Sequence, residues 1–245
     1  WALVELQHRG KEAAGIITNV GRVKNRGTPE QVFNERNLEY LGGHIGVGHV
    51  LYTTSGKTAD AESIKKRAQP YECHLGGKTE RAVYFAFNGN LVNWEELAAD
   101  CRTRGYKKEI LNDTGVIAAL IELSMSSTFE HALKYEVLPR LLWSFSIVFY
   151  DVAEGALWAA RDALGFMPLF IGRRGREFLI AASEDCVFNE GGLNCSLVYE
   201  VAPGSMVRLD PKRERHERSE KDDKHGDDGT IETIFWHHLE KFVPH

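Results

Sequence analysis

The sequence predicts an α+β fold in which helices cover antiparallel β-sheets. Segments of strand composition come first, helical segments follow near residues 93–142, and strand segments return after residue 145. This order favours helices packed on antiparallel sheets, because parallel sheets alternate strand and helix along the chain. The later strand segments also come in pairs joined by short turn-like segments, which is typical of hairpins.

The N-terminal part predicts one short helix and three strands. The helix is expected to end near Gly10, because glycine commonly closes helices. Residues 21–40 are polar and weakly patterned, and a loop is expected before Pro70. Strands are predicted where β-branched and aromatic side chains gather, at residues 15–20, 45–54 and 82–87.

Helix-start signals mark the middle of the chain. Asn93 with Glu96 three residues later forms a capping-box pattern, in which each side chain satisfies an amide of the first turn. Asp113 is a second candidate N-cap. The predicted helices cover residues 93–104, 113–126 and 129–142, and Pro139 interrupts the last of them.

Three hairpins are predicted in the C-terminal part. Their strand pairs are residues 145–152 with 156–160, 169–172 with 178–182, and 198–201 with 206–209. The last pair flanks Pro203 and Gly204, which are common turn residues.

The chain is expected to divide into three parts. Residues 1–210 form the main domain, residues 211–229 an exposed charged loop, and residues 230–245 a C-terminal docking segment. The charged run has almost no apolar side chains, so burying it would gain too little to offset chain entropy. Within the docking segment, His237 and His238 are only a weak metal signal, because adjacent side chains point in different directions.

Composition excludes several classes of protein. The net charge of −5 gives no global basic field for nucleic acid. No apolar run approaches the roughly 20 residues of a transmembrane helix. The four cysteines (Cys73, Cys101, Cys186 and Cys195) form no C-x-x-C pair. We therefore expect reduced thiols in an intracellular protein without a metal or cofactor, and the compartment stays open.

Seven groups of motifs follow one another along nearly the whole chain. They are residues 6–16, 46–56 with 68–71, 87–97, 112–114, 160–169, 182–184 and 201–204. In this order they closely resemble the glutaminase domain of amidophosphoribosyltransferases, a class II glutamine amidotransferase. Collinear motifs are far more specific than a single one. The resemblance implies the N-terminal-nucleophile hydrolase fold, a four-layer α/β/β/α sandwich of two antiparallel sheets.

The resemblance also implies a chemistry. In this family an N-terminal cysteine attacks the glutamine amide, its α-amino group relays the proton, and an arginine binds the substrate α-carboxylate. Asn88 and Gly89 then correspond to the oxyanion site, and Arg9, Thr54 and Asp113 to substrate-binding positions.

The sequence departs from the family pattern at the nucleophile and at the position that binds the substrate α-carboxylate. The nucleophile would precede Trp1 by a strand's length, and the internal cysteines have no free α-amino group. Leu51 stands at the carboxylate-binding arginine, and it is expected to face the site as apolar volume. Phe87, Gly115 and Met167 replace further family residues. No catalytic residue is therefore assigned.

Each remaining site residue also has a structural explanation. Asn88-Gly89 is a strong hairpin-turn signal, and Asp113 is a good helix cap. Thr54 suits a strand end, and Arg9 suits a helix C-terminus.

The sequence therefore favours a catalytically inactive glutaminase-like domain that serves as a structural or interaction subunit of a larger assembly with other proteins. The alternative is the glutaminase domain of an amidophosphoribosyltransferase whose N-terminal cysteine strand is missing from this chain. That domain would release ammonia from glutamine for purine biosynthesis. A small-molecule sensor is a third, weaker alternative.

Overall fold

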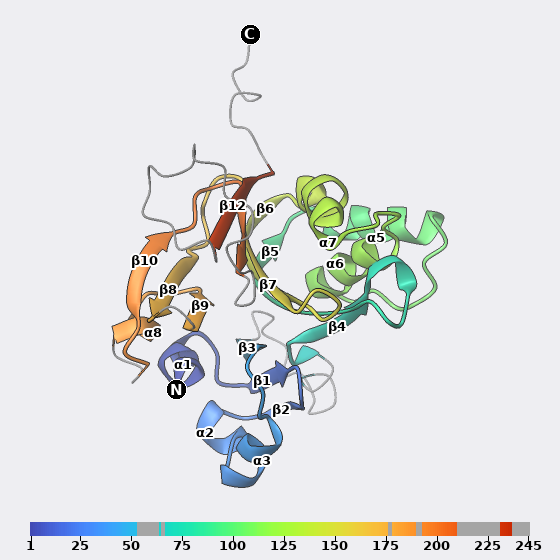
Figure 1. The fold of residues 1–245 in the computed structure, drawn as a ribbon. Coiled ribbons are helices and arrows are strands. Elements are labelled where there is room, and N and C mark those ends of the chain that lie inside the picture. Colours follow the sequence, from blue (N-terminus) through green and yellow to red (C-terminus); the bar gives the residue numbers. More distant parts are fainter. Residues whose placement is uncertain (53–63, 65–66, 176–177, 190–192, 210–230, 237–245) are drawn as a thin grey trace.

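The computed structural model describes residues 1–52, 64, 67–175, 178–189, 193–209 and 231–236 (Figure 1). Thr54, the charged run at 211–229 and His237-His238 lie outside these ranges, so the division of the chain into three parts stays a prediction. No helix in the described ranges is long and apolar enough to cross a membrane.

A six-stranded antiparallel sheet forms the centre of the fold. Its order is β12-β11-β7-β6-β5-β4, so strands from the middle and the end of the chain lie side by side. The strands are β4 (Tyr71–His74), β5 (Ala82–Leu91), β6 (Trp143–Asp151), β7 (Ala156–Arg161), β11 (Ser205–Leu209) and β12 (Ile231–Phe235).

Two three-stranded antiparallel sheets share the next layer. One has the order β2-β1-β3, from β1 (Ala13–Thr18), β2 (Arg22–Arg26) and β3 (Gly46–Leu51). The other has the order β10-β8-β9, from β8 (Phe170–Arg174), β9 (Phe178–Ala182) and β10 (Ser196–Glu200). Val47 of the first packs near Ala86 and Tyr150, and Ile171 of the second packs near Ala159 and Val207. Both small sheets therefore pack on the same face of the large one.

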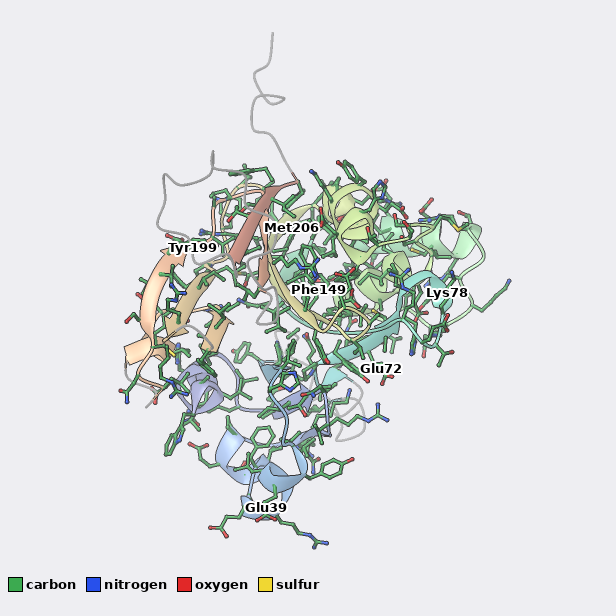
Figure 2. The ribbon with its side chains drawn as sticks, viewed as in Figure 1. Glu39, Glu72, Lys78, Phe149, Tyr199 and Met206 are labelled. Carbon is green, nitrogen blue, oxygen red and sulfur yellow. The ribbon has the colours of Figure 1, made fainter. Side chains whose placement is uncertain are left out.

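Helices cover the other face of the large sheet. They are α5 (Trp94–Thr103), α6 (Asp113–Glu122) and α7 (Phe129–His131), followed by a π-helical turn (Ala132–Val137) and a 3-10 turn (Leu138–Arg140). Side chains alternate between the faces of a strand. Phe85, Phe87 and Phe149 accordingly join the helix-side core, while Ala86 faces the small sheets. Figure 2 shows Phe149 and Met206 in the interior and Glu39 at the periphery.

Short helices form the outermost layer beside the small sheets. They are α1 (Ala2–Glu5), α2 (Pro29–Val32), α3 (Glu35–Tyr40) and α8 (Cys186–Asn189), with a 3-10 turn at Leu6–Arg9. A second 3-10 turn, Leu75–Gly77, packs against α6 on the helical side of the large sheet. The predicted α+β class and the four layers are confirmed, and the second β layer is divided in two.

Three local predictions are wrong. Asn93 forms no capping box, because its side chain instead donates to the Arg140 carbonyl (2.9 Å) and accepts from the Leu142 N–H (3.2 Å). The N-cap of α6 is Asn112, which accepts from the Gly115 N–H (2.9 Å), and Asp113 is the first helical residue.

The third hairpin is also absent. β10 pairs with β8, whereas β11 pairs with β7 and β12, so the chain changes sheets at Pro203-Gly204. Residues 21–40, for which no element was predicted, contain β2, α2 and α3, and β4 was not predicted either.

Candidate functional site

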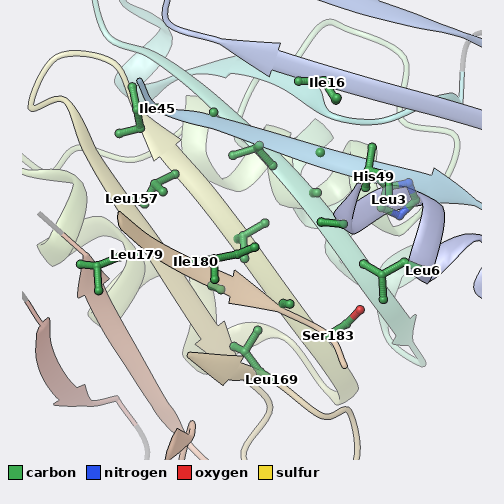
Figure 3. Close-up of a pocket in the computed structure, with 18 of the residues that line it drawn as sticks. Leu3, Leu6, Ile16, Ile45, His49, Leu157, Leu169, Leu179, Ile180 and Ser183 are labelled. Atoms are coloured by element: carbon green, nitrogen blue, oxygen red, sulfur yellow. The ribbon is translucent and has the colours of Figure 1, made fainter. Parts of the chain in front are cut away.

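A cavity of about 500 Å³ lies between the two small sheets (Figure 3). Residues 45–49 at β3 form one wall, and residues 178–183 at β9 form the opposite wall. The large sheet supplies the floor, including Ala86, Asn88 and Ser146, and Leu3 and Leu6 close the side next to α1. Most of the lining is apolar, with polar groups at few places.

The walls of this cavity are the outer edges of two sheets. β3 pairs with β1 along one edge only, and β9 pairs with β8 along one edge only. Among the described residues, neither of the edges that border the cavity has a strand partner. Unpaired edges present rows of N–H and C=O groups that can pair with another strand. The cavity therefore lies between two strand edges that can each accept a further strand.

A polar cluster lies next to the cavity. Arg9 Nη1 lies 2.5 Å from Glu184 Oε1, and Arg9 Nη2 donates to Asn88 Oδ1 (3.4 Å). Asn88 Nδ2 donates to Ser146 Oγ (3.4 Å), and both of these residues line the cavity. His8 Nε2 lies 2.8 Å from Glu184 Oε2. The cluster thus brings together Arg9 and Asn88, two of the residues that the sequence assigns to the site.

Glu184 is charged in this cluster. Burial alone would raise the pKa of Glu184, but the hydrogen bond and charge of Arg9, together with His8, lower it overall. Its carboxylate therefore keeps Arg9 neutralised and oriented beside Asn88.

We expect Glu184→Gln to lower the free energy of unfolding by about 1 kcal/mol, because the ion pair is only partly shielded from water. Chemical denaturation near pH 7 measures this loss. Since the folded-state pKa is lowered, the pair stabilises the fold above the ordinary carboxyl pKa, and the difference should vanish in stronger acid. The exposed Glu109→Gln is the matched control, and an equal loss there would contradict the assignment.

His49 places a neutral imidazole on the cavity wall. Its Nδ1 is buried and has no hydrogen-bond partner among the described residues. Burial lowers the pKa of His49 to about 4, although a backbone hydrogen bond with Phe87 works in the opposite direction. At neutral pH the Nδ1 atom of His49 is therefore uncharged and, among the described residues, has no hydrogen-bond partner at the wall of an apolar cavity.

Asn88 and Gly89 lie inside β5 rather than in a turn. They pair with Ser146 and Phe145 of β6, so the hairpin-turn explanation is wrong. A Cβ at Gly89 would lie 2.3 Å from the Ser144 carbonyl oxygen, which explains why glycine occupies this position.

Asp113 and Leu51 lie near the site but do not line the cavity. Asp113 Oδ2 accepts from the Leu91 N–H (3.0 Å), and burial raises the pKa of Asp113. Leu51 packs with Ala13 and Ala68. Strand alternation places Leu51 on the same face of β3 as His49, but its side chain packs in a neighbouring apolar cluster rather than against the cavity, so its predicted place in the site stays a prediction.

Sequence reasoning missed the roles of several residues in this site. Glu184, Ser146 and His49 were not singled out, although Glu184 and His49 stand within the quoted motifs. Arg9 and Glu184 are 175 positions apart, so no local spacing links them.

Comparison with known proteins places these motifs in context. The profile of the glutamine amidotransferase domain family matches residues 60–189. The chain is 36% identical over 214 residues to "Amidophosphoribosyltransferase 2, chloroplastic" of Arabidopsis thaliana, covering 85% of this chain and 36% of that protein. It is 34% identical over 217 residues to the amidophosphoribosyltransferase of Methanocaldococcus jannaschii, covering 85% of this chain and 43% of that protein. The chain thus spans less than half the length of these relatives.

Solved structures give a consistent result. The glutamine phosphoribosylpyrophosphate amidotransferase from B. subtilis, complexed with ADP and GMP, superposes with a TM-score of 0.76 at 26% identity. The match covers 97% of this chain and 46% of that one.

Proposed function

The chain belongs to the glutamine amidotransferase domain family, and on that premise we propose that it is the glutamine-hydrolysing domain of an amidophosphoribosyltransferase-type protein. In this function it releases the amide nitrogen of glutamine as ammonia for purine synthesis. The observation that carries the proposal is the cavity between the unpaired edges of β3 and β9, which adjoins the Arg9–Asn88–Glu184 cluster.

The cavity supports the proposal because a strand carrying the family nucleophile fits its surroundings. An extended segment between β3 and β9 can pair with both edges and join the two small sheets into one. Ala2 and Leu3 of α1 line the same cavity, so a segment that precedes Trp1 has a short path into it. Alternate side chains of that strand would meet the apolar floor and α1.

The proposed chemistry is an acyl transfer. The cysteine sulfur on that strand forms a bond to the glutamine δ-carbon, and the carbon–nitrogen bond breaks as the proton from the thiol passes to the leaving ammonia. Water then cleaves the thioester to give glutamate. Asn88, held by Arg9 and Ser146, is the side chain positioned to donate to the oxyanion.

A second candidate is the inactive interaction domain that the sequence favours. The position of Leu51 supports it, because a leucine packed on Ala13 and Ala68 cannot pair with the substrate α-carboxylate. Arg9, the guanidinium beside Asn88, is already paired with Glu184.

Glutamate release from glutamine separates the two candidates. The test compares this chain, this chain joined to a cysteine-first strand, and the joined protein with Leu51→Arg, Asn88→Ala or cysteine→serine. The proposal expects no turnover by the chain alone or by the serine control, and turnover by the joined protein. We expect Asn88→Ala to lower kcat about 100-fold and Leu51→Arg to lower KM. If only the Leu51→Arg protein turns over, or none does, the inactive domain is the better description.

A further inference from the structure

Two aromatic side chains are exposed together at one end of the large sheet. Trp143 is 55% exposed and Phe166 is 57% exposed, and their ring centroids lie 5.4 Å apart. Leu142 precedes Trp143 directly and Leu164 lies two residues before Phe166, and both are exposed. Val92 is exposed as well and donates its N–H to the Leu142 carbonyl (3.2 Å). We call these five residues the aromatic patch. Exposed apolar patches of this kind mark protein contacts, and tryptophan is common at their energetic centres.

The backbone at Trp143 is strained. Its φ angle is +102°, in the region that favours glycine and is unfavourable for a bulky residue. More than half of the side chain is in contact with solvent, so burial of the indole within the described fold does little to offset the strain. Contacts within the described fold therefore give little reason for a tryptophan at a position that suits glycine.

The turn that carries Phe166 is fixed by buried polar groups. The carboxylate of Asp162, which is fully buried, accepts from the N–H groups of Phe166 (3.0 Å) and Met167 (2.9 Å). Arg161 donates to the carbonyls of Gly165 (2.8 Å) and Met167 (2.7 Å). Phe166 is therefore presented on an ordered turn, which reduces the entropy lost when a partner docks.

The chain leaves the sheet at the same end as the aromatic patch. The Phe145 carbonyl accepts from the Asp162 N–H (2.8 Å), and the Asp162 carbonyl accepts from the Gly204 N–H (2.9 Å). The Gly204 carbonyl accepts in turn from the Trp236 N–H (3.1 Å). This row runs across the sheet from the start of β6 to the end of β12. The Trp236 ring also stacks on Phe145 at 6.0 Å, two residues from Trp143.

We propose that the aromatic patch is the docking surface for the part of a longer polypeptide that follows this domain. The inference rests on the proposed function only in taking the chain as one domain of such a protein. The relatives are longer, since the chain spans only 36% and 43% of them, and β12 ends beside the patch. None of the five patch residues is charged, so the complementary surface is an aliphatic or aromatic face with an uncharged centre.

Hydroxyl-radical footprinting with mass spectrometry tests the proposal on the natural polypeptide and on residues 1–245 alone. Trp143 and Phe166 should react readily in the short chain and several-fold more slowly in the natural polypeptide. Tyr135, exposed on the helical layer, is the internal control and should react equally in both. Equal labelling of Trp143 in both proteins would overturn the proposal, as would a natural polypeptide that ends at residue 245. Protection that arises in the short chain as its concentration rises would also overturn it, since a second copy is then the occupant.

A glycine variant at Trp143 is expected to stabilise residues 1–245 alone but to weaken the contact between domains in the natural polypeptide. Trp143→Gly should raise the thermal midpoint of residues 1–245, because the strain is removed. In the natural polypeptide it should increase labelling of Phe166 and speed proteolysis between the two domains. The control is Leu111→Ser, an exposed leucine outside the patch, which should leave Phe166 labelling unchanged. If Trp143→Gly stabilises both proteins and leaves Phe166 protected, the patch is not a docking surface.

Discussion

Asp162→Ala is expected to lower the free energy of unfolding by about 4 kcal/mol, enough to unfold a domain of ordinary stability. The carboxylate is fully buried and accepts from four backbone N–H groups. These belong to Phe145 (3.3 Å), Leu164 (3.0 Å), Phe166 (3.0 Å) and Met167 (2.9 Å). A buried donor left without a partner costs about 1–3 kcal/mol, and relaxation of the turn recovers part of the total.

Denaturant unfolding followed by tryptophan fluorescence measures this loss. Asp162→Asn is the matched variant, because it keeps the shape and one accepting oxygen. We expect its loss to lie between those of the wild type and the alanine variant. A loss below about 1 kcal/mol for Asp162→Ala would mean that the turn does not depend on this carboxylate.

Stability is expected to fall by about 3 kcal/mol as the pH drops from 6.5 to 4, because of His49. Burial lowers the pKa of this imidazole from 6.5 to about 4 in the folded state. Between these values the unfolded chain binds the proton more readily than the folded chain does. The stability is therefore complete above pH 6.5 and is lost progressively as the pH approaches 4.

The comparison with His49→Gln isolates this effect. Burial raises the pKa of Asp113 and Asp151, so these carboxyl groups favour the folded state in acid and partly mask the histidine. They are unchanged in the variant, so the difference between the two pH profiles belongs to His49. Unfolding free energies at half-unit steps from pH 7.5 to 4 provide the profiles, and parallel curves would refute the prediction.

The sequence predicted strands correctly where local side-chain composition determines the structure. It did not do so where hydrogen-bonded pairing between distant strands determines it. The apolar run at residues 82–87 predicted a strand, but β5 continues through Asn88-Gly89 to Leu91. Its register with β6 extends over that whole length, and these long-range contacts override a strong local turn signal. Residues 21–40, for which no element was predicted, show the reverse case. Two short helices begin there with capping boxes, formed by Thr28 with Gln31 and by Asn34 with Asn37. Neither helix has an apolar periodicity from which it could be predicted.

The site was predictable only in part, for the same reason. Family motifs identified Arg9 and Asn88, and the structure brings them within hydrogen-bonding distance. Motifs could not indicate that Glu184 neutralises Arg9, since that pairing depends on the packing of η1 (Leu6–Arg9) against the end of β9. The division of one β layer into two sheets was also beyond the sequence, because strand composition does not reveal which edges stay unpaired.

The unpaired edges of β3 and β9 have a consequence for biosynthesis. β3 leaves the ribosome long before β9, so for much of translation only one wall of the cavity exists. Edge strands that stay unpaired during synthesis are prone to pair with other nascent chains. A segment that pairs with both edges can therefore complete its contacts only after β9 has formed. Chaperone demand should be greatest in that interval, and co-expression with a holding chaperone should raise the yield of folded protein.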